Sequence, residues 1–284
     1  MKTSSIDYSL GCRLDAATWA DFNRRAIFED AALRPCASPF PPAALMRNVA
    51  GVDLEADFAK QGALFWEAFS KLLPSPISAY SPVLDFGCGC GRLARLFKGH
   101  PGAVHGCDID ARHVRWMQDN LDFMDTVLVA PAAALPFPDN HFALVFAVSV
   151  LTHLDESDQD RVLAELRRVT RPDGILLVTT HGERAVQRAR WDDRLFGILD
   201  IDVDAFRAAV NTYARGSLAF VPQRGHLTTD DFTYGITFLP EAYVRAHWST
   251  WFAIERIAHG ALQNFQDIVV MRPTKERSEG FSTS

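Results

Sequence analysis

The chain has 284 residues, of which 48% are apolar and 23% charged, and its formal net charge is −6. This length allows one large domain or two small ones with a core that needs no disulfide bonds, and the acidic balance argues against a protein that binds nucleic acid. The longest apolar stretch, residues 143–151, is too short to cross a bilayer, and the N-terminus lacks the apolar segment of a secretory signal.

The first 80 residues are predicted to form helices and loops. Residues 16–33 have a loose helical spacing of apolar positions, and the four prolines of residues 34–42 interrupt that pattern. Residues 56–73 form a clear amphipathic pattern and are predicted to be a helix whose apolar face rests on another surface. We therefore expect residues 1–80 to be an N-terminal helical cap over a ligand site, with the loop at residues 39–51 as a mobile gate.

From residue 81 onward, short apolar runs alternate with helical patterns. The expected strands are residues 83–86, 103–107, 126–130, 143–148 and 175–179. The expected helices are residues 91–98, 111–121 and 157–169, and residues 171–174 are expected to form a turn. This alternation predicts an α/β protein with a doubly wound, mostly parallel sheet that is covered on both faces.

The alternation breaks at residue 183. Residues 183–240 are predicted to be an insertion on the substrate side of the sheet domain, which itself covers residues 81–273. Its helical centre is expected at residues 203–213, a further helix at 241–250, and two closing strands, at least one of them antiparallel, at 251–257 and 266–271. The polar residues 274–284 are predicted to be a disordered tail.

The strongest local signal is a glycine loop between the first predicted strand and the following helix. Residues 83–92 have the sequence VLDFGCGCGR, in which Gly87, Gly89 and Gly91 alternate with other residues. Glycines allow a sharp turn and a close approach of the backbone to a ligand, and the following N–H groups attract an anion. Asp108 lies 21 residues after Gly87, at the end of the second predicted strand, where a carboxylate suits two ribose hydroxyls.

Two classes of nucleotide-like ligand compete for such a loop. Dinucleotide folds have the spacing G-x-G-x-x-G, whereas this loop is G-x-G-x-G with Asp85 two residues before its first glycine. A carboxylate there would repel a pyrophosphate but could bind an ammonium group. S-adenosylmethionine, which has an ammonium, a carboxylate and a ribose, therefore fits better than a nicotinamide cofactor, although a nicotinamide-dependent oxidoreductase stays open as an alternative.

Five segments in order along the chain extend this signal. They are residues 83–92, residues 105–110 (HGCDID), residues 135–142 (LPFPDNHF), residues 149–154 (SVLTHL) and residues 166–174 (LRRVTRPDG). Together they resemble the class I S-adenosylmethionine-dependent methyltransferases, in particular the type 11 group that modifies small molecules and glycans. The resemblance implies a Rossmann-like fold and S-adenosylmethionine as cofactor.

The resemblance also implies a set of cofactor-binding residues. They are Asp85, Gly87, Cys88, Gly89, Gly91, Asp108, Ile109, Ala132 and Ser149. The acid that the family often has after the third strand is absent here, since residues 131–134 are Pro-Ala-Ala-Ala. We therefore expect backbone and apolar contacts to hold the adenine.

Two histidines are the candidate catalytic residues. His153 and His181 follow the fourth and fifth predicted strands, whose carboxyl ends face the ligand crevice. A histidine there can act as a general base near neutral pH, or it can orient a loop. His226 and Tyr234 are weaker candidates. The five cysteines form no C-x-x-C pair, so we expect Cys88 and Cys90 to be packing residues, with no metal site and a reducing, cytoplasmic location.

The expected acceptor is a small molecule rather than a nucleic acid or a membrane component, most plausibly a hydroxyl or carboxylate of a natural product or sugar. Aromatic residues of the insertion are expected to enclose it, namely Trp191, Phe196, Phe206, Tyr213 and Phe220. A catalytically silent protein that binds S-adenosylmethionine is the second alternative. The oligomeric state is left open.

Overall fold

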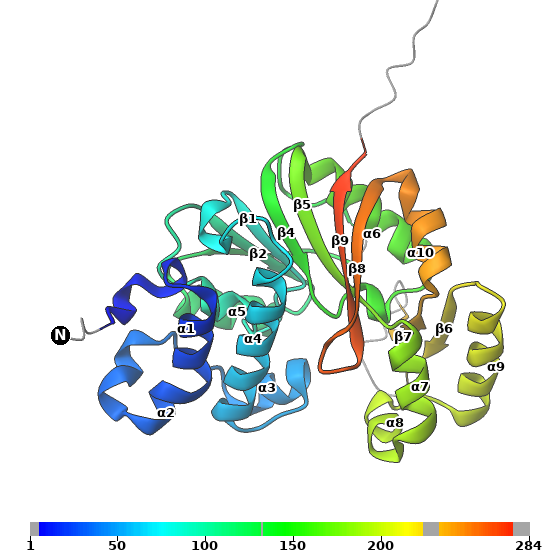
Figure 1. Cartoon of the computed structure of the whole chain (residues 1–284), viewed down its shortest axis with the longest axis horizontal. Helices are drawn as coiled ribbons and strands as arrows, with labels where there is room; N and C mark the ends of the chain where they lie inside the picture. The colour runs from blue at the N-terminus through cyan, green and yellow to red at the C-terminus, as the bar shows by residue number, and fades with distance from the viewer. Residues whose placement is uncertain (1–5, 132, 224–232, 275–284) are drawn as a thin grey trace, which may run out of the picture.

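A seven-stranded sheet forms the centre of the computed structural model, which describes residues 6–131, 133–223 and 233–274 (Figure 1). The strand order is β3-β2-β1-β4-β5-β9-β8. The strands are β1 (Val83–Phe86), β2 (Val104–Asp108), β3 (Asp125–Leu128), β4 (Phe142–Ala147), β5 (Thr170–Thr180), β8 (Phe252–Leu262) and β9 (Gln266–Pro273). The first five pair in parallel, and β9 pairs antiparallel with both β5 and β8. The predicted fold class, with its antiparallel closing strand, is confirmed.

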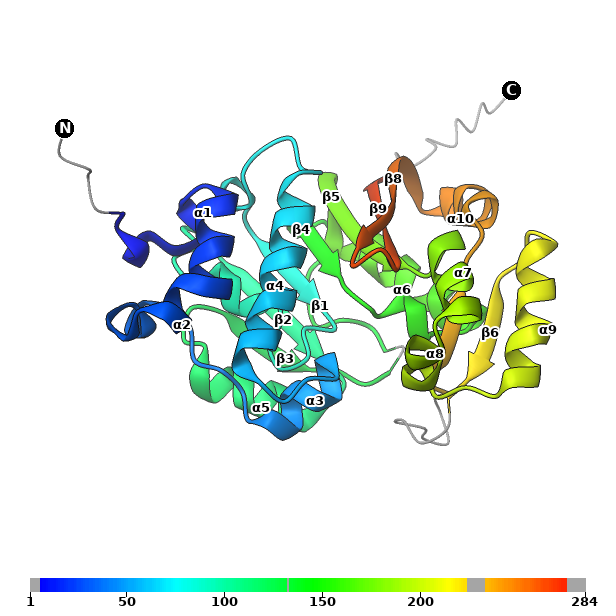
Figure 2. The same cartoon turned by 60° about the horizontal axis from the view of Figure 1, so that its bottom comes forward.

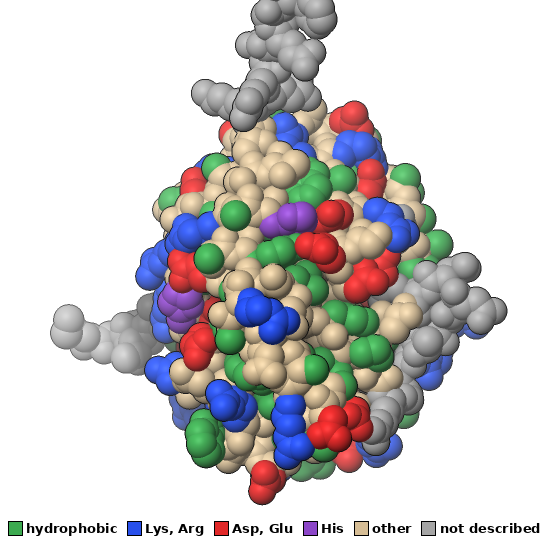
Figure 3. Space-filling model, turned by 90° about the vertical axis from the view of Figure 1, so that its right-hand side faces the viewer, with side chains coloured by type: hydrophobic (Ala, Val, Ile, Leu, Met, Phe, Trp, Pro, Cys, Tyr) green, Lys and Arg blue, Asp and Glu red, His purple; other side chains and the backbone are tan. Residues whose placement is uncertain are grey.

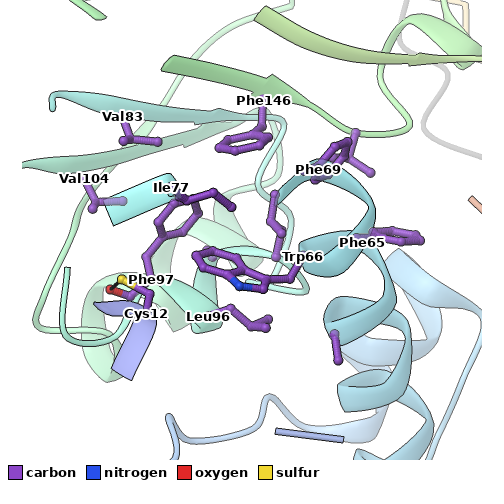
Figure 4. Packing of buried hydrophobic residues seen from close by; sticks show 14 of the residues in the cluster. Cys12, Phe65, Trp66, Phe69, Ile77, Val83, Leu96, Phe97, Val104 and Phe146 are labelled. Carbon is purple, nitrogen blue, oxygen red and sulfur yellow. Dashed lines mark hydrogen bonds between the residues drawn. The ribbon is translucent and has the colours of Figure 1, made fainter. Parts of the chain in front are cut away.

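The N-terminal helices cover one face of this sheet (Figure 2). They are α1 (Ala16–Asp21), α2 (Ile27–Glu29), α3 (Ala43–Ala50) and α4 (Glu55–Ser70), and α5 (Ala111–Asn120) joins them from the sheet domain. Figure 4 shows Trp66 of α4 packing edge-on against Phe97, with ring centroids 5.4 Å apart, and Phe69 against Phe146 of β4 at 5.1 Å. The residues predicted to be a cap thus share one hydrophobic core with the sheet, and most of the predicted gate loop is helix α3.

A close contact with the N-terminal segment shapes the chain after the glycine loop. The sequence predicts an α-helix at residues 91–98, but only a 3-10 helix (Ala94–Phe97) forms there. The indole Nε1 of Trp19 donates a hydrogen bond of 2.8 Å to the carbonyl of Leu96. The backbone N–H of Cys12 donates one of 2.9 Å to the carbonyl of Lys98. The helix prediction is wrong, and the carbonyls at the end of this segment are bound by residues far away in the sequence, which joins it to the N-terminal chain.

Helices α6 (Glu156–Val169) and α10 (Glu241–His247) cover the opposite face of the sheet. The side chain of Asp155 caps α6 by accepting a hydrogen bond from the N–H of Asp158 at 2.9 Å. Phe142 faces Thr170 across β4 and β5, and Leu144 already faces Ile175, so residues 171–174 form a bulge within β5. The turn predicted for these four residues is therefore a bulge within one strand.

The segment after β5 folds into a compact unit at one end of the sheet (Figure 1). It contains α7 (Glu183–Trp191), α8 (Asp193–Leu199), α9 (Val203–Ala214) and an antiparallel pair, β6 (Ala219–Pro222) and β7 (Gly235–Phe238). These elements enclose a hydrophobic cluster of their own, and the face shown in Figure 3 mixes acidic, basic and apolar side chains. The predicted tail lies outside the described residues from position 275 onward, as do Ala132 and His226. Among the described residues, no helix is both long and apolar enough to cross a membrane.

Candidate functional site

The glycine loop after β1 adopts a backbone that only glycine takes easily. Gly87, Gly89 and Gly91 have φ angles of 70°, 53° and 89°. A Cβ atom on Gly87 would lie 2.4 Å from Cγ2 of Val150, and one on Gly89 would lie 2.9 Å from Cγ2 of Val49. One on Gly91 would lie 2.8 Å from Sδ of Met117. The loop is therefore closely packed between the segment after β4 and helices α3 and α5, and all three glycines are required for space as well as for conformation.

The carboxylate of Asp108 fixes this loop. Its Oδ2 accepts a hydrogen bond from the N–H of Gly89, and its Oδ1 accepts one from the N–H of Asp110, both at 2.8 Å. Asp110 in turn caps helix α5 by accepting a hydrogen bond from the N–H of Arg112 at 2.8 Å. The acid at the end of β2 therefore lies against the loop, and the neighbouring acid serves as the helix cap.

A cavity opens where the loop meets the carboxyl ends of β2 and β4, helix α3 and the start of β7. Of the residues predicted from the sequence, its lining includes Asp85, Gly87, Cys88, Gly89, Asp108, Ile109, Ser149 and His153. Gly91 and His181 do not line the cavity, and Ala132 is not among the described residues. The structure thus brings most of the predicted cofactor residues and one predicted catalytic residue to a single cavity.

Residues that the sequence did not single out complete the cavity wall. Asn48 and Val49 come from α3, where no motif marks them, and Arg92 follows the last glycine of the loop. Tyr234, a weak candidate from the sequence, lines the cavity from the strand that returns from the insertion. Arg92 could have been singled out from the sequence, because a cationic residue directly after a glycine loop indicates a site for an anionic group.

Asp85 is buried beside the loop without a full set of partners. Its side chain is 2% exposed, and its Oδ2 has no hydrogen-bond partner within the described chain. Burial raises the pKa of Asp85 to about 7, an effect that the charge of Arg92 opposes and that of Asp108 reinforces. A buried carboxylate in this state is well suited to a ligand that brings its own positive charge.

His153 lies on the other side of the cavity, next to Tyr234. Its Nδ1 is 2.8 Å from the carbonyl oxygen of Gly235. Because a carbonyl can only accept, Nδ1 must carry the proton, and Nε2 is therefore the basic nitrogen of the neutral ring. The imidazole stacks on the ring of Tyr234 with centroids 4.3 Å apart. The segment that returns from the insertion thus sets both the tautomer and the plane of His153.

His181 occupies a different environment at the end of β5. It is 2% exposed, packs on Phe265 with ring centroids 4.7 Å apart, and has its Nε2 3.5 Å from Nε2 of Gln266. Burial lowers the pKa of His181 to about 3. Gln266 also donates to the hydroxyl of Ser149 at 3.0 Å, and the ring of His181 lies edge-on to that of His153 with centroids 6.4 Å apart. His181 is therefore linked to the cavity through neighbouring side chains and does not line it.

The aromatic residues expected to enclose an acceptor lie elsewhere. Trp191 is 83% exposed, Phe206 is buried in the core of the insertion, and none of the five lines the cavity. That expectation is wrong, because the insertion uses these side chains for its own core and surface. Cys88 and Cys90 are buried free thiols, and burial raises the pKa of Cys90 to about 12. In the part of the chain that the structure describes, no three His, Cys, Asp or Glu side chains lie together so that they could hold a metal ion.

One segment of the chain matches known methyltransferases in sequence. Residues 84–178 match a family model described as a methyltransferase domain. The ubiquinone/menaquinone biosynthesis C-methyltransferase UbiE of Burkholderia cenocepacia is 35% identical over 124 residues, which are 40% of this chain and 48% of that protein. The same enzyme of Paraburkholderia phymatum is 35% identical over 122 residues, with the same coverage. The chain thus spans about half the length of the curated relatives that it matches.

Solved structures share the fold at low sequence identity. An S-adenosylmethionine-dependent methyltransferase from Mesorhizobium loti has a TM-score of 0.51 and 16% identity, covering 74% of this chain and 98% of its own. The glycopeptide N-methyltransferase MtfA in complex with sinefungin has a TM-score of 0.50 and 17% identity, covering 73% and 93%. Residues 84–178 thus match a methyltransferase domain in sequence, and the chain shares its fold with solved S-adenosylmethionine-dependent methyltransferases.

Proposed function

We propose that this protein transfers a methyl group from S-adenosylmethionine to a small molecule. The observation that carries the proposal is the buried Asp85, whose unpartnered oxygen lies beside a glycine loop that Asp108 fixes in place. An ammonium group would supply the missing partner of Asp85. The ribose hydroxyls would bind Asp108, which can accept further hydrogen bonds at the oxygens that now bind Gly89 and Asp110.

The remaining cavity residues fit the other parts of the cofactor. Ile109, Val129, Pro131 and Leu135 form an apolar wall beyond Asp108, which suits an adenine ring held without an acid after β3. When bound, the cofactor supplies a methyl group on a positively charged sulfur, which is already a strong electrophile. The protein has to align an acceptor with that methyl group and exclude water, so it needs no metal for this task.

We propose that His153 is the general base and that the methyl group is transferred to an oxygen atom of the acceptor. His153 lines the cavity with Nε2 as its basic nitrogen, while His181 lies behind Gln266 and Ser149. A hydroxyl must lose its proton during transfer, and a neutral imidazole can take it near pH 7. The acceptor class that we propose is a hydroxyl or carboxylate of a natural product or sugar. UbiE is named a C-methyltransferase and MtfA an N-methyltransferase, so carbon and nitrogen are the alternative acceptor atoms to test.

A product assay tests this proposal directly. The full chain is incubated with S-adenosylmethionine and separate pools of hydroxyl, carboxylate, amine and activated-carbon acceptors, and S-adenosylhomocysteine is quantified. Release of S-adenosylhomocysteine with one pool, and a mass gain of one methyl group on the acceptor, is the expected result. Calorimetric titration with S-adenosylmethionine and with NADH serves as the control for the cofactor. Binding of NADH alone would contradict the proposal, and cofactor binding without turnover would favour a silent binding protein.

A further inference from the structure

The hairpin of β8 and β9 ends in a tight turn with an uncommon backbone. Gln263 and Asn264 have φ angles of 56° and 53°, and the N–H of Phe265 donates to the carbonyl of Leu262 at 2.9 Å. Two successive left-handed residues closed by such a bond are typical of a type I′ turn. The guanidinium of Arg188 on α7 donates a hydrogen bond of 3.1 Å to the carbonyl of Gln263, which fixes this tip beside α7 (Figure 1).

The two residues after this turn contact the end of β5 and the segment after β4. Phe265 packs on His181, with ring centroids 4.7 Å apart. The amide of Gln266 contacts the hydroxyl of Ser149, with its Nε2 3.0 Å and its Oε1 3.3 Å from Oγ. The same Nε2 lies 3.5 Å from Nε2 of His181. The buried His181 thus supports the hairpin, and Gln266 reaches Ser149, which lines the cavity.

Ser149 is itself held in a conformation that serine rarely adopts. Its φ angle is 58°, in the left-handed region that favours glycine. A residue with a side chain stays there only where the surrounding structure fixes it. The N–H of Ser149 donates to Oγ1 of the buried Thr179 at 2.7 Å, and its hydroxyl contacts Gln266. Gln266 therefore connects two unfavourable backbone segments, the hairpin tip and Ser149, which together contain three of the five non-glycine residues with positive φ in the described chain.

The conformation of Ser149 sets the direction of the turn that follows it. Cγ2 of Val150 lies against the glycine loop, 2.4 Å from the position of a Cβ atom on Gly87. The carbonyl of Val150 accepts a hydrogen bond of 2.9 Å from the N–H of His153. A change at Ser149 would therefore displace the backbone of His153 and weaken the contact of its Nδ1 with the carbonyl of Gly235.

We propose that Gln266 is a positioning residue for methyl transfer, which holds Ser149 in its left-handed conformation and thereby orients the basic Nε2 of His153 toward the acceptor. This inference rests on the proposed function, because it concerns how the general base of the same cavity is placed. Gln266 is not among the residues that line the cavity, so it acts through Ser149. His181 has a part in the same task, since it supports Phe265 and Gln266 from behind.

Nitrogen-15 NMR of the histidine rings tests the inference without a cofactor or an acceptor. At a pH where the ring is neutral, His153 of the wild-type protein should show one tautomer, because its Nδ1 donates to the carbonyl of Gly235. Gln266→Met keeps the length of the side chain but loses both contacts with Ser149. The signals of His153 should then move toward a mixture of tautomers. Comparison with His153→Gln assigns these signals.

Turnover on an identified acceptor is the second measurement. We expect Gln266→Met to lower kcat about tenfold or more and to change the affinity for S-adenosylhomocysteine less than about threefold, because a displaced base affects the transfer step. Ser149→Ala removes the same contact from the other side and should lower kcat by a similar factor. The double variant should be no worse than either single variant, since the two side chains act as one unit.

The control is Gln187→Met, the same substitution at an exposed glutamine of α7, which should change neither measurement. Unchanged signals of His153 in Gln266→Met would overturn the inference. A lower resistance to denaturant with kcat unchanged would also overturn it and would leave Gln266 a purely structural role. Additive losses in the double variant would refute the route through Ser149.

Two further outcomes are covered by the same design. If Gln266→Met does not fold, Ser149→Ala decides the question, because it deletes one hydroxyl and leaves the bond to Thr179 in place. If the wild-type protein methylates no acceptor, the proposed function fails. The NMR signals of His153 still show whether Gln266 positions that ring, so the two failures can be told apart.

Discussion

The carboxylate of Asp108 accepts a hydrogen bond of 2.8 Å from the backbone N–H of Gly89, which joins the end of β2 to the glycine loop. We expect Asp108→Ala to weaken the binding of S-adenosylhomocysteine by at least about 1.5 kcal/mol, because charge-assisted bonds to the ribose and the support of the loop are both lost. Calorimetry gives the affinity. Asp125→Ala, at an exposed acid on β3, is the matched control and should bind normally. Unchanged affinity in Asp108→Ala would contradict the ribose assignment.

Cofactor affinity should depend on pH through Asp85. Burial raises the pKa of this carboxyl to about 7 in the free protein, and an ammonium group binds only the ionised form. Affinity should therefore be constant above that pH and fall roughly tenfold per pH unit below it. Titrations of the wild-type protein at several pH values check this. In Asp85→Asn the affinity should be low throughout and without this slope, and a slope that persists would assign the titration to another group.

When no ligand is bound, the ionised carboxylate of Asp85 should also lower the free energy of unfolding. Its pKa is 3.8 in the unfolded chain and about 7 in the folded one, so between these values the folded protein holds more protons. Its contribution to the free energy of unfolding then decreases as the pH rises through this interval and stays low above it. Asp85→Asn should raise the free energy of unfolding at about pH 8 by about 1 kcal/mol or more. Denaturant titration measures it, and a difference that does not shrink toward about pH 4 would contradict the cause.

Turnover should depend on His153 far more than on His181. His153→Gln removes the base while an amide can still donate to the carbonyl of Gly235, so we expect a loss of about a hundredfold in kcat with cofactor affinity intact. His181→Gln should cost less than about tenfold, since that ring does not line the cavity. Rates are compared on an identified acceptor over a range of pH. Near-normal turnover in both variants would mean that the acceptor arrives deprotonated or uses another base.

The stability of the fold should depend strongly on Arg95. Its guanidinium donates to the carbonyls of Ser38 and Pro39, and Arg95→Ala would leave the carbonyl of the buried Ser38 without this donor. We expect a loss of about 3 kcal/mol in the free energy of unfolding. Arg115→Ala, on the exposed side of α5, should change it by less than about 0.5 kcal/mol. A small effect at Arg95 would mean that the N-terminal segment contributes little to the domain.

The parts of the structure that depend on local sequence could be predicted. The strands have continuous apolar runs, and the glycine loop with Asp85 and Asp108 has a fixed spacing. The sheet was therefore predicted, and most of the residues proposed to bind the cofactor line one cavity. The chain after Gly91 could not be predicted in the same way. Its apolar residues do have a helical spacing. However, Trp19, which lies 77 residues earlier in the sequence, donates a hydrogen bond to the carbonyl of Leu96. Long-range partners of this kind leave no local pattern.

The acceptor side of the site shows the same limit. Composition marked the aromatic residues of the insertion, but it could not show that Phe206 faces inward and Trp191 outward. Tyr234 reaches the cavity because β7 begins beside it, and Arg92 lies at the cavity with Gln61 and Phe65 of α4 beside its guanidinium. These roles depend on which elements meet in space. Neither composition nor spacing along the chain contains that information.

The insertion has a hydrophobic cluster separate from the two that hold the sheet, and it reaches the cavity through the short segment at Tyr234 and Gly235. A graft could therefore replace α7 to β7 as a block while the cofactor side keeps its packing. The graft would succeed only where the incoming unit still offers a carbonyl to Nδ1 of His153, which makes that one hydrogen bond the compatibility requirement between the two parts.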